Sequence, residues 1–444
     1  MSTQTLDVPQ SAATPSDGWL AGGSRRLSGR VAFYLQASIV VFLLASSSAP
    51  TPLYAVYQAR WGFSPITTTV VFGIYALAVL AALLTVGSLS DHVGRRPVLL
   101  AALALQSVTM LIFATATGVP ELLVARVLQG LTIGAAVGAL GAGMIDLHKS
   151  KGTIANSVGP LLGTAVGAIG SSLLVQYLPD PTHLVYLVLL GIFVAQAVGV
   201  LLMPESSSTR PGALASLRPQ FALPKAAREP FLVAAPALVA VWALVGFYGS
   251  LSPTLVRLLV GSHSFVIGGL ALCALTASGG VAVLVLHTAP PRALMVLGTS
   301  TLLVGVGVTL VAITETWTIA FFVGTAIAGV GFGSAFQGAI RSVLPLAAPH
   351  ERSGVLSLLF VVSYLAFGMP AVVAGYLVVQ SGDVLATARE YGLAVMVFAV
   401  LALVGVTRPA RQSVVESEAA KVVPCARKAL AESGTGDQSL AEAC

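Results

Sequence analysis

Long apolar segments separated by short polar breaks dominate this sequence. Between residues 31 and 407, prolines, glycines and charged residues divide the chain into twelve apolar segments. Each is long enough to cross a bilayer, which takes about 20 residues of helix. The strands of a membrane β-barrel instead alternate apolar with polar residues. The pattern therefore predicts an all-α membrane protein with twelve transmembrane helices, at 31–57, 66–88, 97–117, 119–145, 153–178, 183–203, 230–257, 264–287, 292–313, 316–345, 353–381 and 388–407.

Polar regions at both ends and in the middle divide the chain further. We expect a cytoplasmic N-terminal tail at 1–30, an N-terminal six-helix bundle at 31–203, a cytoplasmic central linker at 204–229, a C-terminal six-helix bundle at 230–407 and a disordered cytoplasmic tail at 408–444. The first 30 residues hold no apolar core of a signal peptide. The first span is therefore expected to act as its own insertion signal.

The basic residues predict which way the helices run. If the N-terminus is cytoplasmic, nineteen Lys and Arg residues lie in cytoplasmic segments, against three at the outer ends: Arg60, Arg257 and Arg389. Cytoplasmic loops of membrane proteins carry an excess of Lys and Arg. We therefore expect both termini in the cytoplasm, an N-in and C-in topology with an even number of helices.

Two short segments recur at nearly the same spacing. Ser47–Thr51 (SSAPT) resembles Ser250–Thr254 (SLSPT) at an offset of 203, and Gly130–Ala136 (GLTIGAA) resembles Gly329–Ala335 (GVGFGSA) at an offset of 199. Corresponding segments at similar offsets indicate two duplicated, pseudo-symmetric six-helix bundles. Transporters built from such repeats bind substrate between the repeats, near the middle of the bilayer.

Composition excludes several classes of protein. The chain is 56% apolar and only 9% charged, with a mean hydropathy of +0.91, whereas a soluble domain is about 25% charged. The net charge of +6 is spread over many short loops, so no basic patch for nucleic acid is expected. The three cysteines have no metal-like spacing, so we expect no metal site, disulfide framework or thiol catalysis.

The most specific segment lies between the second and third spans and reads GSLSDHVGRR, from Gly87 to Arg96. It resembles the loop signature of the major facilitator superfamily, G-x-L-a-D-r-x-G-r-r, and departs from it at His92. The matching positions are Gly87, Leu89, Asp91, Gly94, Arg95 and Arg96. The resemblance covers residues 31–407 and implies the major facilitator fold and a secondary transporter that works by alternating access.

In that family this loop closes the cytoplasmic side of the transporter. The resemblance implies that Asp91 faces the positive N-terminal end of the eleventh span, near Ser353 and Gly354. It also implies that Arg95 pairs with an acid at the inner end of the fourth span, where Asp146 lies. We expect these residues to form a cytoplasmic latch that acts as a switch more than as a source of stability.

The fourth span carries a second match, because Arg126 followed by Gly130 resembles the R-x-x-x-G motif of the family. Arg126 lies about 10 Å deep, at 1.5 Å per helical residue. A charge at that depth is expected to face a cavity or a partner; the alternative is a side chain that extends outward to lipid head groups. Glu121 lies on a different helix face, and both residues are candidates for coupling or for binding substrate charge.

The fifth span contains Gly159, Pro160 and Gly163, which resemble the G-x-x-x-G-P-x-x-G-G sequence of the antiporter branch, with Ala155 and Thr164 in place of two glycines. Glycine and proline together permit close helix approach and a bend at which the halves could rock. A plain packing kink is the alternative interpretation.

No Asp, Glu, His or Lys lies deep in a predicted span. Since the one deep charge is positive, we expect a neutral lipophilic or anionic substrate, with Asp91, Asp146 and Glu121 as the titratable candidates near a pathway. Polar and aromatic residues predicted to line the cavity are Gln36, Ser46, Tyr54, Tyr75, Gln129, Trp242, Tyr248, Gln337 and Tyr364.

Together these features predict proton-coupled efflux of a small organic compound by a multi-pass protein of the cell membrane. The alternatives are proton-driven or facilitated uptake of a metabolite and, remotely, a polytopic membrane enzyme, which would need a cluster of His, Asp or Cys at one membrane face. We expect no enzymatic activity and no cofactor, with the proton gradient as energy source. The expected partners are the substrate and membrane lipid, and the protein is expected to be a monomer.

Overall fold

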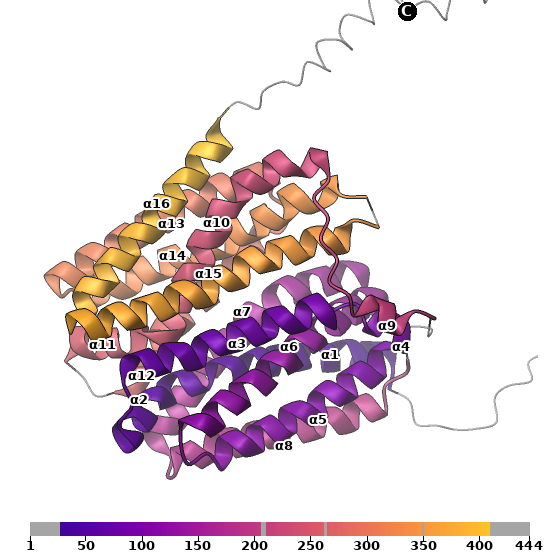
Figure 1. Ribbon diagram of the computed structural model, residues 1–444, viewed down its shortest axis with the longest axis horizontal. Coiled ribbons are helices and arrows are strands. Elements are labelled where there is room, and N and C mark those ends of the chain that lie inside the picture. The colour runs from indigo at the N-terminus through magenta and orange to yellow at the C-terminus, as the bar shows by residue number, and fades with distance from the viewer. Residues whose placement is uncertain (1–26, 206–209, 262–263, 349, 409–444) are drawn as a thin grey trace, which may run out of the picture.

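The computed structural model describes residues 27–205, 210–261, 264–348 and 350–408, which form helices and connecting loops (Figure 1). Twelve helices or joined helix pairs in this part of the chain are long and apolar enough to cross a membrane, which confirms the predicted number of spans. The predicted tails at 1–30 and 408–444 lie almost wholly outside the described residues.

The N-terminal half contains eight helices, of which α4 is a single turn and α1 and α2 together form the first span. Their bounds are α1 Gly29–Ser48, α2 Pro50–Trp61, α3 Pro65–Thr85, α4 Ser90–Val93, α5 Arg95–Ala114, α6 Val119–Leu147, α7 Lys149–Tyr177 and α8 Pro181–Leu201.

The linker contains the short helix α9, and the C-terminal half again begins with two consecutive helices, α10 and α11. The helices are α9 Ala213–Ser216, α10 Lys225–Ser250, α11 Ser252–Val260, α12 Phe265–Val285, α13 Pro291–Glu315, α14 Thr318–Val343, α15 Arg352–Ser381 and α16 Val384–Thr407, with a short 3-10 turn at Leu344–Leu346. Helix α10 begins before the predicted boundary at residue 230, so the linker is shorter than expected.

Local sequence signals account for many of the helix ends. Helices α3, α8 and α13 each begin with a proline, whose missing N–H costs nothing at the first helical position. Helices α2 and α11 end at Gly62 and Gly261, whose φ angles of 68° and 63° lie in the left-handed region that glycine adopts without strain. These two glycines lie 199 residues apart, which is the offset between the repeated segments GLTIGAA and GVGFGSA.

The first and seventh spans, predicted as single helices, are each broken. The breaks lie at Ala49, between α1 and α2, and at Leu251, between α10 and α11. Prolines at positions 50, 52 and 253 have no N–H, so the carbonyl four residues before each loses its helical donor. The repeated segments SSAPT and SLSPT are therefore the break points of two equivalent spans.

The second repeat consists of glycines that allow close helix packing. A Cβ at Gly130 or Gly134 of α6 would meet the backbone of α3 at Tyr75 and Val79, and one at Gly329 or Gly333 of α14 would meet the backbone of α12. Helices α3 and α12 are the second membrane spans of their halves, and α6 and α14 are the fourth spans. The two halves therefore use the same glycines at the same joint.

Two pairs of long helices join the halves: α3 packs against α15, and α7 packs against α12 (Figure 1). We call the helix ends that hold residues 86–94 and the linker the linker face, and the ends that hold residues 62–64 and 178–180 the distal face. The outer helix surfaces remain apolar, with Val281, Val304 and Val397 more than half exposed, as lipid contact requires.

Candidate functional site

A cavity of about 100 Å³ lies between the two halves, at the middle of the long helices. Its N-terminal wall is made by Leu44, Ser47, Ser48, Thr51, Phe72, Tyr75, Pro160, Leu161 and Thr164, and its C-terminal wall by Trp242, Val245, Gly249, Leu272, Thr276, Phe332, Tyr364 and Phe367. A mostly apolar concave site with a few polar groups is typical of small-molecule binding. No charged side chain is among these lining residues.

The C-terminal wall is aromatic. The ring of Trp242 lies 5.4 Å from that of Tyr364, 5.7 Å from that of Phe367 and 6.1 Å from that of Phe332, measured between centroids. The contacts with the two phenylalanines are edge to face, an arrangement that aromatic rings favour. Three helices, α10, α14 and α15, thus hold one rigid aromatic surface.

The N-terminal wall carries hydroxyl groups instead. Ser47 Oγ donates to the Tyr75 hydroxyl at 2.9 Å, and Ser48 Oγ donates to the carbonyl of Thr164, also at 2.9 Å. Both serines lie in the last turn of α1, directly before the break at Ala49. The break therefore places polar groups at the centre of the bundle.

Arg126 lies behind this wall and has no exposed surface. Its Nε donates to the Tyr54 hydroxyl at 2.8 Å, Nη2 donates to the same hydroxyl, and Nη1 donates to the Ser47 carbonyl at 2.9 Å and to Gln129 Oε1 at 2.6 Å. The guanidinium also lies over the ring of Tyr75, 5.3 Å from its centroid. This placement excludes the alternative in which Arg126 extends outward to lipid head groups.

The network around Arg126 satisfies the carbonyls of the broken first span. Gln129 Nε2 donates at 3.0 Å to the carbonyl of Ser46, the acceptor that Pro50 leaves without its helical donor. Gln106 Nε2 donates to Ser46 Oγ at 2.9 Å. Buried polar groups need such partners because an unpaired one costs about 1–3 kcal/mol. Arg126 and Gln129 therefore hold the break in place rather than line the cavity.

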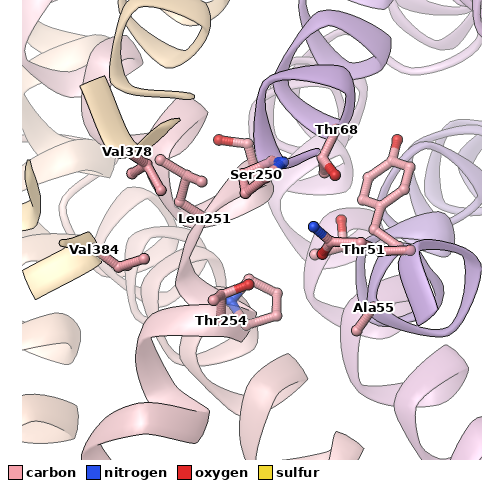
Figure 2. Close-up of a pocket in the computed structure, with 12 residues that line it drawn as sticks. Thr51, Ala55, Thr68, Ser250, Leu251, Thr254, Val378 and Val384 are labelled. Carbon is pink, nitrogen blue, oxygen red and sulfur yellow. The ribbon is translucent and has the colours of Figure 1, made fainter. Parts of the chain in front are cut away.

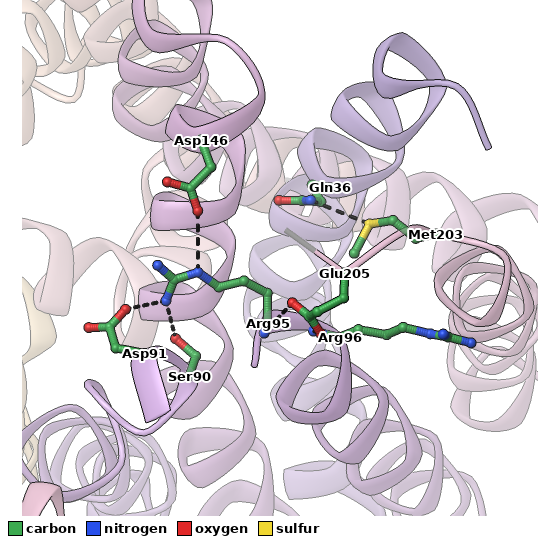
Figure 3. Close-up of polar contacts among 8 residues, drawn as sticks. All are labelled: Gln36, Ser90, Asp91, Arg95, Arg96, Asp146, Met203 and Glu205. Carbon is green, nitrogen blue, oxygen red and sulfur yellow. Dashed lines mark hydrogen bonds and ion pairs between the residues drawn. The ribbon is translucent and has the colours of Figure 1, made fainter. Parts of the chain in front are cut away.

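A charged cluster lies on the linker face (Figure 3). Arg95 pairs through Nη1 with Asp91, which is four residues away, and its Nε lies 3.5 Å from Asp146 Oδ2 at the end of α6. Arg95 Nη1 also donates to Ser90 Oγ at 2.8 Å. The structure thus brings together the three residues of the expected latch, all within the N-terminal half.

Glu205, which the sequence analysis missed, belongs to the same cluster. Its carboxylate accepts the backbone N–H groups of Arg95 at 2.9 Å and of Arg96 at 3.0 Å (Figure 3). These are orphan donors at the positive N-terminal end of α5, where a carboxylate is stabilising. Gly94 makes room for this carboxylate, because a Cβ at that position would lie only 2.9 Å from Glu205 Oε2. Its φ of 100° is also one that residues with a side chain rarely adopt.

The structure does not bring Asp91 and the start of α15 together through a hydrogen bond or ion pair among the described residues. Ser353 Oγ donates to Gln220 Oε1 at 3.2 Å, and the space beside Gly354 is filled by Ala222. The linker therefore occupies the N-terminal end of α15. It also binds the loop, since His92 Nδ1 lies 3.0 Å from the Pro211 carbonyl and the His92 carbonyl accepts the N–H of Arg210 at 2.8 Å.

The distal face holds a second pocket, of about 90 Å³, between the outer ends of the two halves (Figure 2). Thr51, Ala55 and Thr68 line it from one side, and Ser250 and Thr254 from the other. Thr51 Oγ donates at 3.3 Å to the carbonyl of Gly249, the acceptor that Pro253 leaves without its helical donor. The two break points thus touch each other across the interface.

Comparison with known proteins identifies the family. The model of the Major Facilitator Superfamily matches residues 36–295. The chain belongs to this superfamily. It is therefore a multi-pass membrane protein, with twelve candidate spans in the part of the chain that the structure describes, and its similarity to inner-membrane relatives places it in the cell membrane.

Two curated relatives and one solved structure illustrate the similarity. The chain is 28% identical over 173 residues to the inner membrane transport protein YnfM of Escherichia coli, covering 38% of this chain and 40% of that protein. It is 36% identical over 159 residues to the putative multidrug resistance protein MdtD of Cronobacter sakazakii, covering 33% and 32%. The matches thus span well under half of each relative. The crystal structure of the nucleoside transporter NupG superposes with a TM-score of 0.62 at 13% identity, over 84% of this chain and 98% of that one.

Several residues predicted for the cavity of this superfamily member lie elsewhere. Gln36 donates to Met203 Sδ at 3.4 Å, the Tyr248 hydroxyl lies 2.7 Å from Thr325 Oγ1, and Gln337 is absent from the cavity walls. Ser46, Tyr54 and Gln129 form the network behind the wall. Tyr75, Trp242 and Tyr364 line the cavity itself.

The remaining predicted residues lie at helix ends or helix contacts. Glu121, in the first turn of α6, accepts from Thr117 Oγ1 at 3.5 Å. Helix α7 is continuous through Pro160, while Gly159 and Gly163 pack against α1 at Val40 and Val41. In the structure this motif is a close-packed helix contact, with Pro160 at the cavity.

The sequence analysis missed Phe72, Thr276, Phe332 and Phe367 in the cavity wall. In a chain that is 56% apolar, a single phenylalanine carries no functional signal. Phe367 could have been predicted, because it lies three residues after Tyr364 and residues three apart share a helix face.

Proposed function

We propose that this chain is a secondary transporter that carries a small organic compound across the cell membrane by alternating access, and that it exports the compound in exchange for protons. The observation that carries the proposal is the cavity without charged lining residues between two pseudo-symmetric halves. A site shared by two halves can face either side of the membrane when the halves rock about it.

The contacts at the distal face support a rocking motion. The halves meet there through the bond from Thr51 to Gly249 and through the N–H of Phe265, which donates to Gln176 Oε1 at 2.9 Å. Such bonds contribute about 1 kcal/mol each, so they can be exchanged for contacts on the linker face. With the N-in topology that the basic residues predict, the linker face is cytoplasmic.

Two observations support export in exchange for protons, and a third limits where the proton could bind. The glycine and proline motif in α7 resembles that of antiporters, and one relative is named as a putative multidrug resistance protein. In the described spanning helices, each Asp, Glu, His and Lys lies within seven residues of a helix end. The proton is therefore assigned to an acid at a membrane face, for which Asp91 and Asp146, both paired with Arg95, are the candidates.

Flux into proteoliposomes tests this proposal. Purified protein is reconstituted, a pH gradient is imposed, and entry of neutral, anionic and cationic aromatic compounds is measured against protein-free liposomes. We expect saturable entry of a neutral compound that an acidic lumen accelerates and a protonophore abolishes. Acceleration by an acidic exterior would mean uptake instead of export. Equal rates with and without the gradient would remove coupling, and the absence of saturable flux would overturn transport itself.

A further inference from the structure

The geometry points to an uncharged substrate that has a flat aromatic ring at one end and a hydrogen-bond acceptor oxygen at the other. This inference rests on the proposed function, because it treats the central cavity as the substrate site. It follows from the different chemistry of the two cavity walls and from the way in which Arg126 is enclosed.

The aromatic wall fits the ring. Trp242, Phe332, Tyr364 and Phe367 meet at centroid distances of 5.4–6.2 Å, and each of them borders the cavity. Because neighbouring rings already brace Trp242, its exposed part is a fixed, flat surface. Such a surface favours a second ring through stacking or edge contact.

The hydroxyl wall fits the acceptor. The Tyr75 hydroxyl accepts a hydrogen bond from Ser47, so its own proton remains for a ligand, and Tyr75 borders the cavity. The guanidinium of Arg126 over the Tyr75 ring draws electron density from the phenol and strengthens it as a donor. A carbonyl or ether oxygen facing Tyr75 would receive this proton.

Charged substrates find no direct partner in this cavity. Arg126 has no exposed surface and its three guanidinium nitrogens already donate to Tyr54, Ser47 or Gln129, so a carboxylate in the cavity cannot form a direct ion pair with it. An organic cation meets the positive charge of Arg126 and no acid among the lining residues. Desolvating either charge without a partner is costly, whereas an uncharged compound avoids this cost.

Four naphthalene compounds of matched size test the inference by binding alone. Detergent-purified full-length protein is incubated with tritiated 2-acetylnaphthalene, and competition is measured with 2-ethylnaphthalene, 2-naphthoate and 2-naphthylmethylammonium. We expect 2-acetylnaphthalene to bind saturably and about fivefold more tightly than 2-ethylnaphthalene, the effect of one hydrogen bond. The two charged compounds should bind more weakly than either.

Variants assign the two ends of the ligand to the two walls. Tyr75→Phe keeps the ring and removes the hydroxyl, so it should weaken 2-acetylnaphthalene about fivefold and leave 2-ethylnaphthalene unchanged. Trp242→Leu removes the flat ring surface and should weaken both compounds. Tyr391→Phe is the control, because Tyr391 donates to the carbonyl of Ala243 at 2.7 Å and does not border the cavity; it should bind both compounds as the unsubstituted protein does.

The outcomes separate this inference from the transport proposal. Tight binding of naphthoate or of the ammonium compound, no saturable binding of 2-acetylnaphthalene, or an equal loss for both neutral compounds in Tyr75→Phe would overturn the inference. If the predicted binding order holds but no compound crosses proteoliposomes, the transport proposal fails and the assignment of the cavity stands.

Discussion

The buried arginine shows how a single residue follows from a defect in a neighbouring helix. Prolines 50 and 52 free backbone carbonyls in the middle of the first span, where water cannot satisfy them. From α6, Gln129 donates to the Ser46 carbonyl that Pro50 frees, and Arg126 donates to the neighbouring Ser47 carbonyl at the break. The guanidinium carries more donors than any other side chain, which explains why arginine occupies this position although no acid faces it among the described contacts.

Removing this side chain should destabilise the protein. Arg126→Ala leaves the Ser47 carbonyl and Gln129 Oε1 without their donor, so we expect the free energy of unfolding to fall by about 2–3 kcal/mol. Thermal denaturation in detergent measures this as a lower Tm. Arg60→Ala, at an exposed position near the end of α2, is the matched control and should leave the Tm unchanged. Equal Tm values for the two variants would show that Arg126 is not part of a stabilising network.

Sequence could indicate some of these residues and not others. Asp91 and Arg95 are neighbours in one loop, and the end of α6 places Asp146 on the same face, so the motif and the helix ends suffice to group them. Glu205 caps α5 from 110 residues away, and nothing in its own neighbourhood signals this. That Arg126 lies behind the cavity wall instead of in it depends on the helix break, which apolar periodicity does not reveal.

At the scale of elements, the repeated glycines are the clearest trace of the duplicated halves. Gly134 and Gly333 lie 199 residues apart and let α6 and α14 touch the backbones of α3 and α12. Short matches of glycine and alanine arise easily in apolar sequences. Their equivalent positions in the fold show that both segments allow the fourth span of a half to pack closely against the second span.

These two glycines should respond alike to substitution. A Cβ at Gly134 would lie 2.6 Å from the Val79 carbonyl oxygen, and one at Gly333 would lie 2.9 Å from the carbonyl carbon of Gly279. Because backbone cannot yield cheaply, Gly134→Ala and Gly333→Ala should each lower the Tm. Gly191→Ala is the control, since a Cβ there meets nothing within 4 Å, and alanine favours the helix by up to about 1 kcal/mol. A Tm for either test variant at or above that of the control would contradict the packing role.

The number and order of the spans followed from hydrophobic length alone, because a bilayer fixes how many apolar residues a helix needs. The breaks in the first and seventh spans did not, because an apolar run of spanning length does not show whether the helix continues through it. Their prolines were the available signal, and a proline inside a membrane helix is tolerated where neighbouring side chains satisfy the freed carbonyls.

At the scale of the whole molecule, the two halves enclose an uncharged cavity and touch at the distal face. Sequence predicts the duplication and the site between the halves, but the choice of helices at the interface depends on tertiary packing. Helices α3 and α15, and α7 and α12, form two equivalent contacts, so the halves can tilt without unfolding either bundle.

Alternating access requires that closing the distal face opens the linker face. A Cβ at Gly269 would lie 2.9 Å from that of Ser172, and a small helix separation brings the pair to the disulfide spacing of about 3.8 Å. Ser172→Cys with Gly269→Cys, in a chain whose native cysteines are replaced, locks this face on oxidation. Gly130→Cys with Ala78→Cys locks α6 to α3 within one half and serves as the control.

The decisive measurement is the distance across the linker face. Cysteines are substituted at the exposed positions Thr153 and His287, at the ends of α7 and α12. They are labelled through thioethers while the distal disulfide is formed, and pulsed electron resonance then measures the distance between the two spin labels. With the distal disulfide formed, we expect one long-distance population, and reduction should restore a second, shorter one. The control pair should show both populations throughout. The same distance distribution in the oxidised and reduced protein would contradict alternating access.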